Sequence, residues 1–169
     1  MATTHGTVKK TQLKDYANIR QTGLIAIKLD EGDELRWIRR SNGDDEIVMS
    51  TNFGQAIRFK ESDARPMGRA ARGVRGIRLR AGDSVVGMDL AREDQKLLVM
   101  SENGYGKLTK IDHFASHKRG GVGIKSAVVN KKTGNIVTVV SLDPSASEVL
   151  MISTKGQTIR VSLQDIPTL

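Results

Sequence analysis

Arginine side chains are concentrated in one stretch of the sequence, where their chemistry favours binding to phosphate. The seven arginines between residues 54 and 80 are Arg58, Arg65, Arg69, Arg72, Arg75, Arg78 and Arg80. A guanidinium group donates two parallel hydrogen bonds to one phosphate, which the ammonium group of lysine cannot do. Five glycines near these and later basic residues would let backbone N–H groups approach phosphates: Gly73, Gly76, Gly120, Gly121 and Gly123. We therefore expect a surface that binds duplex DNA through its backbone and reads little of its sequence.

No residues in the sequence have the spacing of a catalytic or metal site. The chain has no cysteine, which excludes disulfides, cysteine-ligated zinc and thiol nucleophiles. His5, His113 and His117 lack the spacing of metal ligands, and no P-loop string for nucleotide binding is present. Tyr16 and Tyr105 are interpreted as structural residues. We therefore expect no catalytic residue, metal or cofactor in this chain.

The elements that must position the basic side chains recur about every fifty residues. Each of four units has Ser or Thr followed by a turn that ends in glycine. The turn glycines are Gly6, Gly54, Gly104 and Gly156, separated by 48, 50 and 52 residues. Glycine at one place in every unit indicates a backbone constraint, such as the positive φ of a hairpin turn, rather than a ligand contact.

Two further landmarks keep the same order and a similar step. A glycine-led apolar segment at residues 23–29 returns at 73–79 and, more weakly, at 121–125. A turn with glycine followed by Asp or Asn stands at Gly32-Asp33, Gly82-Asp83 and Gly134-Asn135. Three landmarks at one period indicate a repeat protein.

Each unit is predicted to consist of β-strands. The runs at residues 46–49, 96–100 and 148–152 are short, aliphatic and bounded by turn residues. Residues 25–29 alternate, which predicts Ile25, Ile27 and Leu29 on one face of a further strand. Four short strands in about fifty residues predict an all-β fold, a propeller-like array of four-stranded blades.

The array is expected to be incomplete. Dividing 169 residues by a period of about fifty gives about 3.4 repeats. The chain begins almost at its first turn, without the apolar strand that precedes the later turns, and it ends before a fourth glycine-led segment. We expect a single partial domain over 1–169, with repeat units at 1–47, 48–97, 98–149 and 150–169, and no transmembrane segment.

The net charge of +8 is distributed in phase with the repeat. Residues 54–80 carry eight basic and two acidic side chains (+6), and residues 104–132 carry seven and one (+6). The stretches at 29–48 and 81–103 sum to −4 and −3. Because equivalent positions of a radial array lie on one rim, the basic segments are predicted to form a continuous band that binds an anionic partner.

Several strings of the sequence resemble the C-terminal domain of the gyrase A protein of DNA gyrase, a bacterial type IIA topoisomerase. They are GTVKKT at 6–11, DEGDEL at 30–35, RFKESD at 58–63, RPMGR at 65–69, RGVRGIRL at 72–79 and ENGYGK at 102–107. The resemblance covers nearly the whole chain, in the order of the family's middle-to-late blades. It implies a β-pinwheel, which is a propeller-like array whose blades exchange strands.

The resemblance also implies a function without catalysis in this chain. Domains of this family wrap double-stranded DNA around a basic outer rim and so support negative supercoiling. The implied partners are DNA, the remainder of the gyrase A protein and the gyrase B protein, whose other domains would use ATP and Mg. The implied location is the bacterial cytoplasm, with the nucleoid. Two alternatives remain: the corresponding domain of topoisomerase IV, and a propeller used as a protein-interaction scaffold.

A degenerate form of the family's signature heptapeptide, Gln-Arg-Arg-Gly-Gly-Lys-Gly, stands in the third unit. It reads His117-Lys118-Arg119-Gly120-Gly121-Val122-Gly123. Leu108 stands where Lys10, Arg58 and Arg160 stand in the other units, so Lys107 is expected to contact phosphate in its place. The predicted DNA-binding residues are Lys9, Lys10, Lys28, Arg58, Lys60, Arg69, Arg72, Arg75, Arg78, Lys107, Lys118, Arg119, Lys125 and Arg160.

Overall fold

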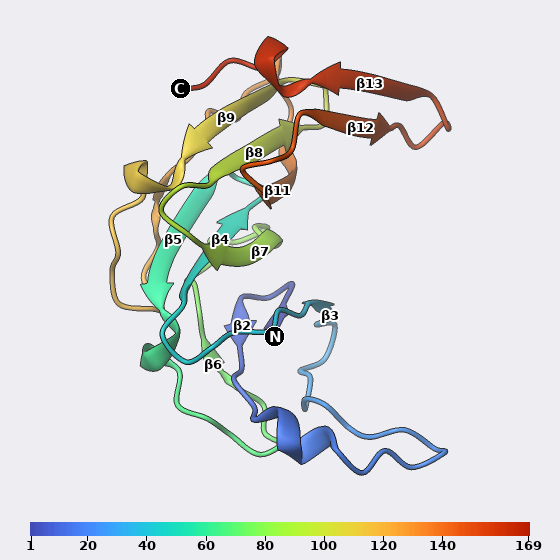
Figure 1. Ribbon diagram of the computed structural model, residues 1–169, viewed down its shortest axis with the longest axis vertical. Helices are drawn as coiled ribbons and strands as arrows, with labels where there is room; N and C mark the ends of the chain where they lie inside the picture. The colour runs from blue at the N-terminus through green and yellow to red at the C-terminus, as the bar shows by residue number, and fades with distance from the viewer.

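The computed structural model describes all residues 1–169, and its regular elements are β-strands and short 3-10 turns (Figure 1). The strands are β1 Ala2–Thr3, β2 Thr7–Val8, β3 Leu35–Trp37, β4 Glu46–Thr51, β5 Gln55–Lys60, β6 Val74–Arg75, β7 Val85–Ala91, β8 Lys96–Ser101, β9 Gly106–Lys110, β10 Ile124–Lys125, β11 Ile136–Leu142, β12 Glu148–Ile152 and β13 Thr158–Ser162. The 3-10 turns are η1 Leu13–Tyr16, η2 Glu61–Asp63, η3 Ile111–His113 and η4 Leu163–Asp165. The all-β prediction is confirmed, and β4, β8 and β12 lie where strands were predicted. No helix is long and apolar enough to cross a membrane.

The strands form four sheets that share strands between units. Their orders are β3-β1-β2-β6, β10-β5-β4-β7, β11-β8-β9 and β12-β13. Strand β6 follows β5 in the sequence but pairs with β2, and β10 follows β9 but pairs with β5. This exchange is the expected β-pinwheel arrangement, which is confirmed. The prediction of four strands per blade holds for the first two sheets, whereas the third has three strands and the fourth has two.

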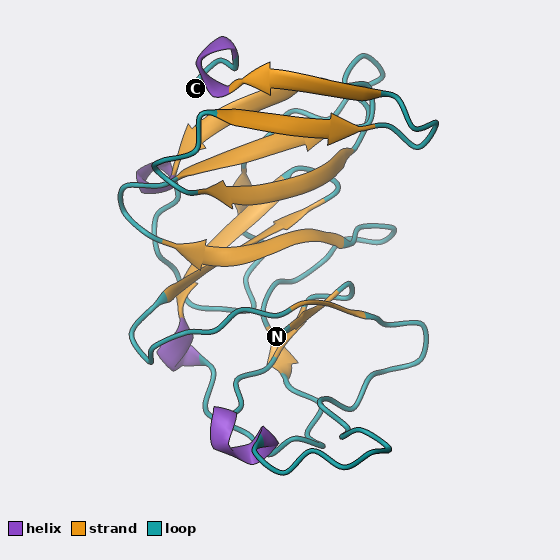
Figure 2. Ribbon diagram, turned by 45° about the vertical axis from the view of Figure 1, so that its right-hand side comes forward, coloured by secondary structure: helices purple, strands orange, loops and turns teal.

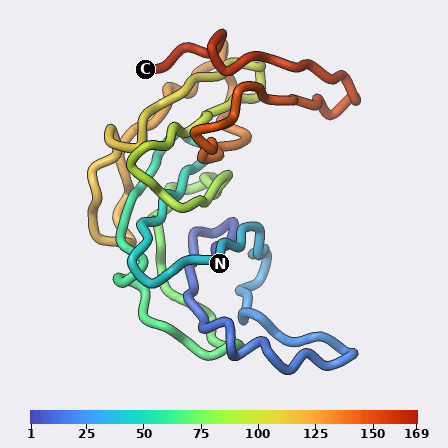
Figure 3. The backbone as a smooth tube through the Cα atoms, in the orientation of Figure 1, coloured from blue at the N-terminus to red at the C-terminus, as the bar shows by residue number.

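The sheets follow one another along an open arc. In Figure 3 the first unit lies at one end of the arc and the β12–β13 hairpin at the other. Figure 2 shows that the strands make up the body of the arc, while the helical turns are short.

Hydrophobic cores lie between successive sheets, so an inner sheet is buried on both faces. In β8, Leu97 and Val99 belong to the core shared with the second sheet. Leu98 and Met100 belong to the core shared with η4 and the β12–β13 hairpin. Alternate residues of a strand point to opposite faces, and this explains why the run is apolar at every position rather than at every second one.

All four repeated turn glycines have a positive φ, and in the first two units a close backbone neighbour also excludes a side chain. Gly54 has a φ of 77°, and a Cβ there would lie 2.5 Å from the carbonyl oxygen of Ala127. The close neighbour belongs to the segment that directly follows the exchanged strand β10, because Ser126 N donates to Gly54 O at 2.8 Å. The first unit repeats this contact, with Gly76 N donating to Gly6 O at 2.8 Å. The predicted backbone constraint is therefore confirmed.

Two predictions about the first unit are wrong. The strand before its turn is present as β1, although it is only two residues long. Residues 25–29 do not form a strand, and Ile25 is 68% exposed while Ile27 is buried. The equivalent segments become β6 and β10 by pairing with the hairpin of the preceding unit, and residues 25–29 have no such hairpin beside them.

Candidate nucleic-acid interface

The exchanged strands place basic side chains at equivalent positions of two successive sheets. Arg75 of β6 lies opposite Thr7 of β2, and Lys125 of β10 lies opposite Gln55 of β5. Each is the second residue of the outermost strand of its sheet, and each is exposed. Strand exchange therefore brings a cation from the next unit to the edge of each of these two sheets.

The glycine-led segment of the third unit was predicted to begin at residue 121, but in the structure it begins two residues later. A Cβ added at Gly73 would meet Val8 O at 2.7 Å, and one added at Gly123 would meet Ala56 O at 2.4 Å. Gly123, not Gly121, is thus equivalent to Gly73. The sequence offers both glycines, and only the pairing of β10 with β5 distinguishes them.

The box-like motif, residues 117–123, runs along the segment that contains β6. Gly120 N donates to Gly76 O at 2.6 Å, and Arg78 N donates to Gly121 O at 2.8 Å. Residues 72–78 and 117–125 are therefore joined by backbone hydrogen bonds, and we call these two segments the basic rim. Lys28 extends this pattern into the first unit, because its N–H donates to Ala71 O at 3.2 Å as that of Arg78 does to Gly121 O.

Arg119 and Lys118 hold the box-like motif against the second unit. The Nε of Arg119 donates to Asp63 O and its Nη1 donates to Arg75 O, both at 2.9 Å. Carbonyl oxygens position the guanidinium without neutralising its charge. Lys118 Nζ pairs with Asp63 Oδ1 at 2.8 Å, yet the Lys118 side chain is 89% exposed. Asp63 is not among the predicted site residues, and its only signal in the sequence is an acid within an otherwise basic segment.

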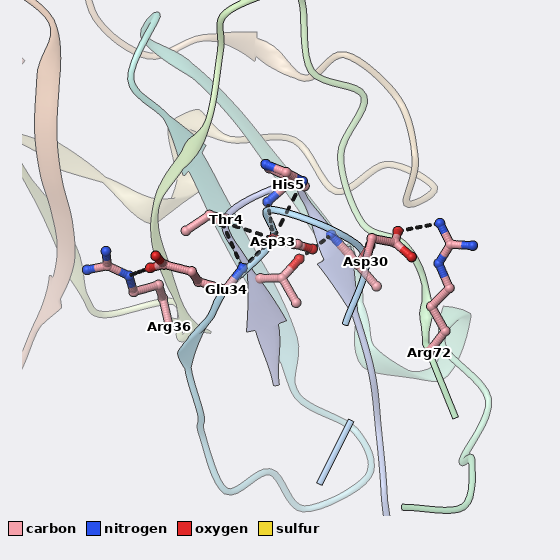
Figure 4. Close-up of polar contacts among 9 residues, drawn as sticks. Thr4, His5, Asp30, Asp33, Glu34, Arg36 and Arg72 are labelled. Atoms are coloured by element: carbon pink, nitrogen blue, oxygen red, sulfur yellow. Dashed lines mark hydrogen bonds and ion pairs between the residues drawn. The ribbon is translucent and has the colours of Figure 1, made fainter. Parts of the chain in front are cut away.

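Three arginines of the basic rim line a shallow groove of about 550 Å³. They are Arg72, Arg75 and Arg78, and His5 also lines the groove. Arg72 forms an ion pair with Asp30 (Figure 4). Both partners are more than a third exposed, and ion pairs exposed to this degree contribute little stability. A phosphate can therefore replace the Asp30 carboxylate at low cost.

Asp33 holds the hairpin turn of the first unit, whose residues His5, Gly6 and Thr7 also line this groove. Figure 4 shows the contacts of Asp33. Its Oδ1 accepts hydrogen bonds from His5 N at 2.8 Å, Thr4 Oγ1 at 2.9 Å and Glu34 N at 2.9 Å. Burial acts to raise the pKa of Asp33, but the hydrogen bonds from Thr3, His5, Thr4 and Glu34 together outweigh it and lower the pKa.

The hydrogen bond between the aspartate of the Gly-Asp turn and the hairpin turn recurs in the second unit and changes in the third. Asp83 Oδ1 accepts a hydrogen bond from Phe53 N at 3.1 Å, as Asp33 Oδ1 does from His5 N in the first unit. In the third unit the direction reverses, because Asn135 N donates to Glu102 Oε2 at 2.9 Å. The repeated Gly-Asp turn thus ties the last strand of each unit to its hairpin turn.

Lys9 does not lie on the surface, so its predicted contact with DNA is wrong. The residue is 2% exposed, and its Nζ donates to the carbonyl oxygens of Ala26 and Arg69. Burial, followed by the charge of Arg69, lowers the pKa of Lys9. Its ammonium group joins backbone segments and is out of reach of a phosphate.

Arg58 is likewise engaged in contacts within the fold, so this placement does not favour its contact with DNA, which stays a prediction. Its side chain is 13% exposed and forms an ion pair with Glu46. Its Nη1 also donates to Ile111 O and Phe114 O of the next unit, both at 3.3 Å. The Arg58 guanidinium therefore holds the 3-10 turn of the third unit.

Leu108 occupies the equivalent position and makes an apolar version of this contact. It is buried with Leu98, Met100 and Ile166. The equivalence follows from parallel bridges, which join Lys10 to Pro66, Arg58 to Ser116 and Leu108 to Thr168. In the second and third units this position contacts the next unit, so the comparison with Arg58 does not support a phosphate contact of Lys107, which stays a prediction. Lys107 is half-buried, and burial lowers its pKa.

The other predicted basic residues are exposed or half-exposed: Lys10, Lys28, Lys60, Arg69, Arg72, Arg75, Arg78, Lys118, Arg119, Lys125 and Arg160. Lys60 ends β5, and Arg160 of β13 pairs with Glu148 of β12. These two residues lie outside the basic rim. Their assignment to DNA stays a prediction, as does that of the rim residues.

The tyrosines make local contacts. Tyr16 in η1 donates from Oη to Ala26 O at 3.4 Å. Tyr105 lies in the turn before β9, with the Lys132 ammonium 5.5 Å from the centre of its ring, a cation–π distance.

Comparison with known proteins agrees with this architecture. The sequence profile of the family described as "DNA gyrase C-terminal domain, beta-propeller" matches residues 1–42, 45–92, 95–143 and 147–169. The DNA gyrase A protein of Staphylococcus epidermidis is 40% identical over 98% of this chain, which spans only 19% of that protein.

Two solved structures resemble the fold closely. The C-terminal domain of DNA topoisomerase IV aligns with a TM-score of 0.90 and 27% identity, over 98% of this chain and 52% of that one. A DNA gyrase A C-terminal domain aligns with a TM-score of 0.81 and 26% identity, over 99% of this chain and 56% of that one. With its exchanged strands and its family match over nearly every residue, the chain belongs to the family of DNA gyrase C-terminal domains.

Proposed function

We propose that this domain binds duplex DNA on the basic rim and bends it, as a non-catalytic part of a type IIA topoisomerase that introduces negative supercoils. The observation that carries the proposal is the repetition of exposed cations at equivalent places of successive units. Arg75 is equivalent to Lys125, and Lys28 is equivalent to Arg78. A duplex that follows the arc would meet these cations in turn.

Binding of this kind is governed by phosphate contacts. Neutralised phosphates release counterions, so affinity should fall with salt at a log–log slope of about −0.9 per contact. The all-β architecture supplies no helix for the major groove. The expected binding is therefore strong at low salt and nearly independent of DNA sequence. A protein-interaction scaffold would show no such steep dependence on salt.

The rest of the enzyme would supply the chemistry. The proposed partners are the remainder of the gyrase A protein and the gyrase B protein, which would use ATP and Mg²⁺ in the bacterial cytoplasm, with the nucleoid. No cofactor is proposed for this chain. Its residues hold and bend the DNA segment, and strand cleavage and passage take place in the other domains.

A linking-number assay tests the proposal. A nicked plasmid is ligated in the presence of increasing amounts of the domain, and the topoisomers are separated after the protein is removed. Bending or wrapping with a fixed hand shifts the distribution in proportion to bound protein. DNA binding without any shift would contradict a DNA wrap of fixed hand and, with it, the proposed support of negative supercoiling.

The corresponding function in topoisomerase IV is the second candidate, because the structural match to that domain has the higher TM-score. The two candidate functions differ in whether the domain wraps DNA with a fixed hand. The gyrase function requires a shift in linking number with a single sign. The topoisomerase IV function would give DNA binding of similar salt dependence with little or no shift.

A further inference from the structure

A histidine shares the groove of the basic rim with three arginines. His5 belongs to the hairpin turn of the first unit, while Arg72, Arg75 and Arg78 belong to the segment around β6. All four residues line the groove of about 550 Å³, which we call the arginine groove. His5 is not among the predicted DNA-binding residues. An anion that enters the arginine groove would nevertheless meet its imidazole together with the guanidinium groups.

The backbone of His5 is held in place while its ring remains available. His5 N donates to Asp33 Oδ1 at 2.8 Å (Figure 4). Neither ring nitrogen takes part in a hydrogen bond, and Nδ1 lies 3.9 Å from Asp33 Oδ1. The side chain is 51% exposed. A different side chain at this position should therefore leave the turn folded.

The repeat shows that the hairpin turn does not require histidine at this position. The residues that directly precede the turn glycines of the four units are His5, Phe53, Asn103 and Lys155. An aromatic ring, an amide and an ammonium group thus replace the imidazole in the other units. Lys155 also shows that the turn accepts a permanently charged side chain.

The acidic groups beside His5 come from the Gly-Asp turn of the first unit. The carboxylate of Asp33 is buried and accepts the hydrogen bonds described above. Asp30 pairs with Arg72, and Glu31 and Glu34 are exposed. Carboxylates keep their negative charge from about pH 5.5 to about pH 8, so these groups do not change their charge in that range.

The cationic groups beside His5 are the three arginines of the arginine groove, which stay charged at all these pH values. An imidazole, in contrast, gains a proton between about pH 8 and about pH 5. His5 is therefore the residue lining the arginine groove whose charge changes in this range. Protonation adds a fourth cation to a surface that already attracts anions.

We propose that His5 binds a DNA phosphate together with the arginines of the groove and makes DNA affinity depend on pH. The imidazolium has two N–H donors. Nδ1 lies near Asp33, and Nε2 donates to the phosphate, a charge-assisted hydrogen bond. The neutral ring leaves the phosphate to the arginines. This inference rests on the proposed function and names a further residue and a form of regulation for the same surface.

Fluorescence anisotropy with one duplex at about pH 8 and about pH 5.5, over a range of KCl concentrations, tests the inference. The unmodified chain should bind about fivefold more tightly at the lower pH, as expected for one exposed ionic contact. Its log–log salt slope should be steeper by about 0.9 there, because one more phosphate is neutralised. His5→Gln should bind at both pH values as the unmodified chain does at the higher one. His5→Lys should bind at both pH values as the unmodified chain does at the lower one.

The other two histidines supply matched controls. His113→Gln removes an exposed histidine of η3 outside the basic rim, and His117→Gln removes the exposed histidine of the box-like motif. Both variants should keep the full dependence on pH, and circular dichroism should show the same fold for all four variants. Retained pH dependence in His5→Gln, or its loss in His117→Gln, would overturn the inference.

The same measurements separate this inference from the proposed function. DNA binding that depends on salt but not on pH would overturn the role of His5 and leave the proposed function intact. No salt-dependent DNA binding at either pH would overturn both, because His5 would then have no phosphate to bind.

Discussion

The guanidinium of Arg119 donates from Nη1 to the backbone carbonyl oxygen of Arg75 at 2.9 Å. This bond joins the third unit to the second within the basic rim. Because the acceptor is a carbonyl and not a carboxylate, the two positive charges are held together without being neutralised. The relative positions of the cations are thus determined before DNA arrives, which reduces the ordering cost of binding.

Removal of rim arginines should weaken binding to all duplex sequences alike. Each of Arg72→Ala, Arg75→Ala and Arg78→Ala removes an exposed guanidinium from the groove. For each phosphate that is no longer neutralised, the log–log salt slope should become shallower by about 0.9. Fluorescence anisotropy with two unrelated duplexes over a range of KCl concentrations measures both quantities.

Lys155→Ala is the matched control for these variants. It removes an exposed cation from the turn between β12 and β13, outside the basic rim, and should leave the salt slope nearly unchanged. If the triple arginine variant binds as tightly as the unmodified chain, the basic rim is not the DNA surface.

Alanine substitutions at two equivalent arginines should lower the free energy of unfolding by different amounts, because one ion pair is largely covered and the other is exposed. Arg58→Ala leaves Glu46 without its partner in a pair whose side chains are 13% and 16% exposed, and should cost about 3 kcal/mol. Arg160→Ala breaks the same pair type at side chains 70% and 43% exposed, and should cost less than about 1 kcal/mol. Urea unfolding followed by circular dichroism compares the two, and equal losses would contradict the structural role of Arg58.

Alanine substitutions at two turn glycines distinguish the cost of backbone strain from the cost of a steric clash. Gly54→Ala combines a φ of 77° with a Cβ 2.5 Å from Ala127 O, so the exchanged strand must move. Gly104→Ala has a φ of 80° but no neighbour within 4 Å, and should cost only about 1 kcal/mol. Gly54→Ala should cost several times more in the free energy of unfolding. A similar cost for both would mean that the exchanged strand does not constrain the turn.

The hydrogen bonds that Asp33 accepts should make the free energy of unfolding depend on pH in the acid range. The folded-state pKa of Asp33 is lowered, so its contribution is complete above the unfolded value of about 3.9 and is lost as pH falls through the folded value. Asp33→Asn should therefore reduce stability by about 1–2 kcal/mol at pH 6, with the gap closing below about pH 4. Asp94→Asn, an exposed loop substitution, should show no such gap in urea titrations at either pH.

The local features of the fold could be predicted because each follows from a short stretch of chain. A positive φ needs glycine, and so Gly6, Gly54, Gly104 and Gly156 reveal the repeat. Short aliphatic runs predict β4, β8 and β12. The register of β10 could not be predicted, because Gly121 and Gly123 are equally suitable until β5 is beside them.

The candidate site was only partly predictable for the same reason. Arg75 and Lys125 are exposed cations, as the charge pattern suggests. Lys9 and Arg58 are also cations, yet Lys9 is buried and Arg58 largely covered, and both donate to carbonyl groups of residues distant in sequence. Residue type predicts that a side chain prefers an anion or an acceptor, but not which acceptor the fold places within reach.

The sequence by itself determined the repeat, the all-β class, the excess of positive charge and the family resemblance, because these depend on residue type and spacing. Only the tertiary structure decided which cations face solvent, because strand exchange pairs β6 and β10 with hairpins of the preceding unit. It alone also revealed that His5 shares a groove with Arg72, Arg75 and Arg78, since the turn of the first unit and the segment around β6 meet only in the fold.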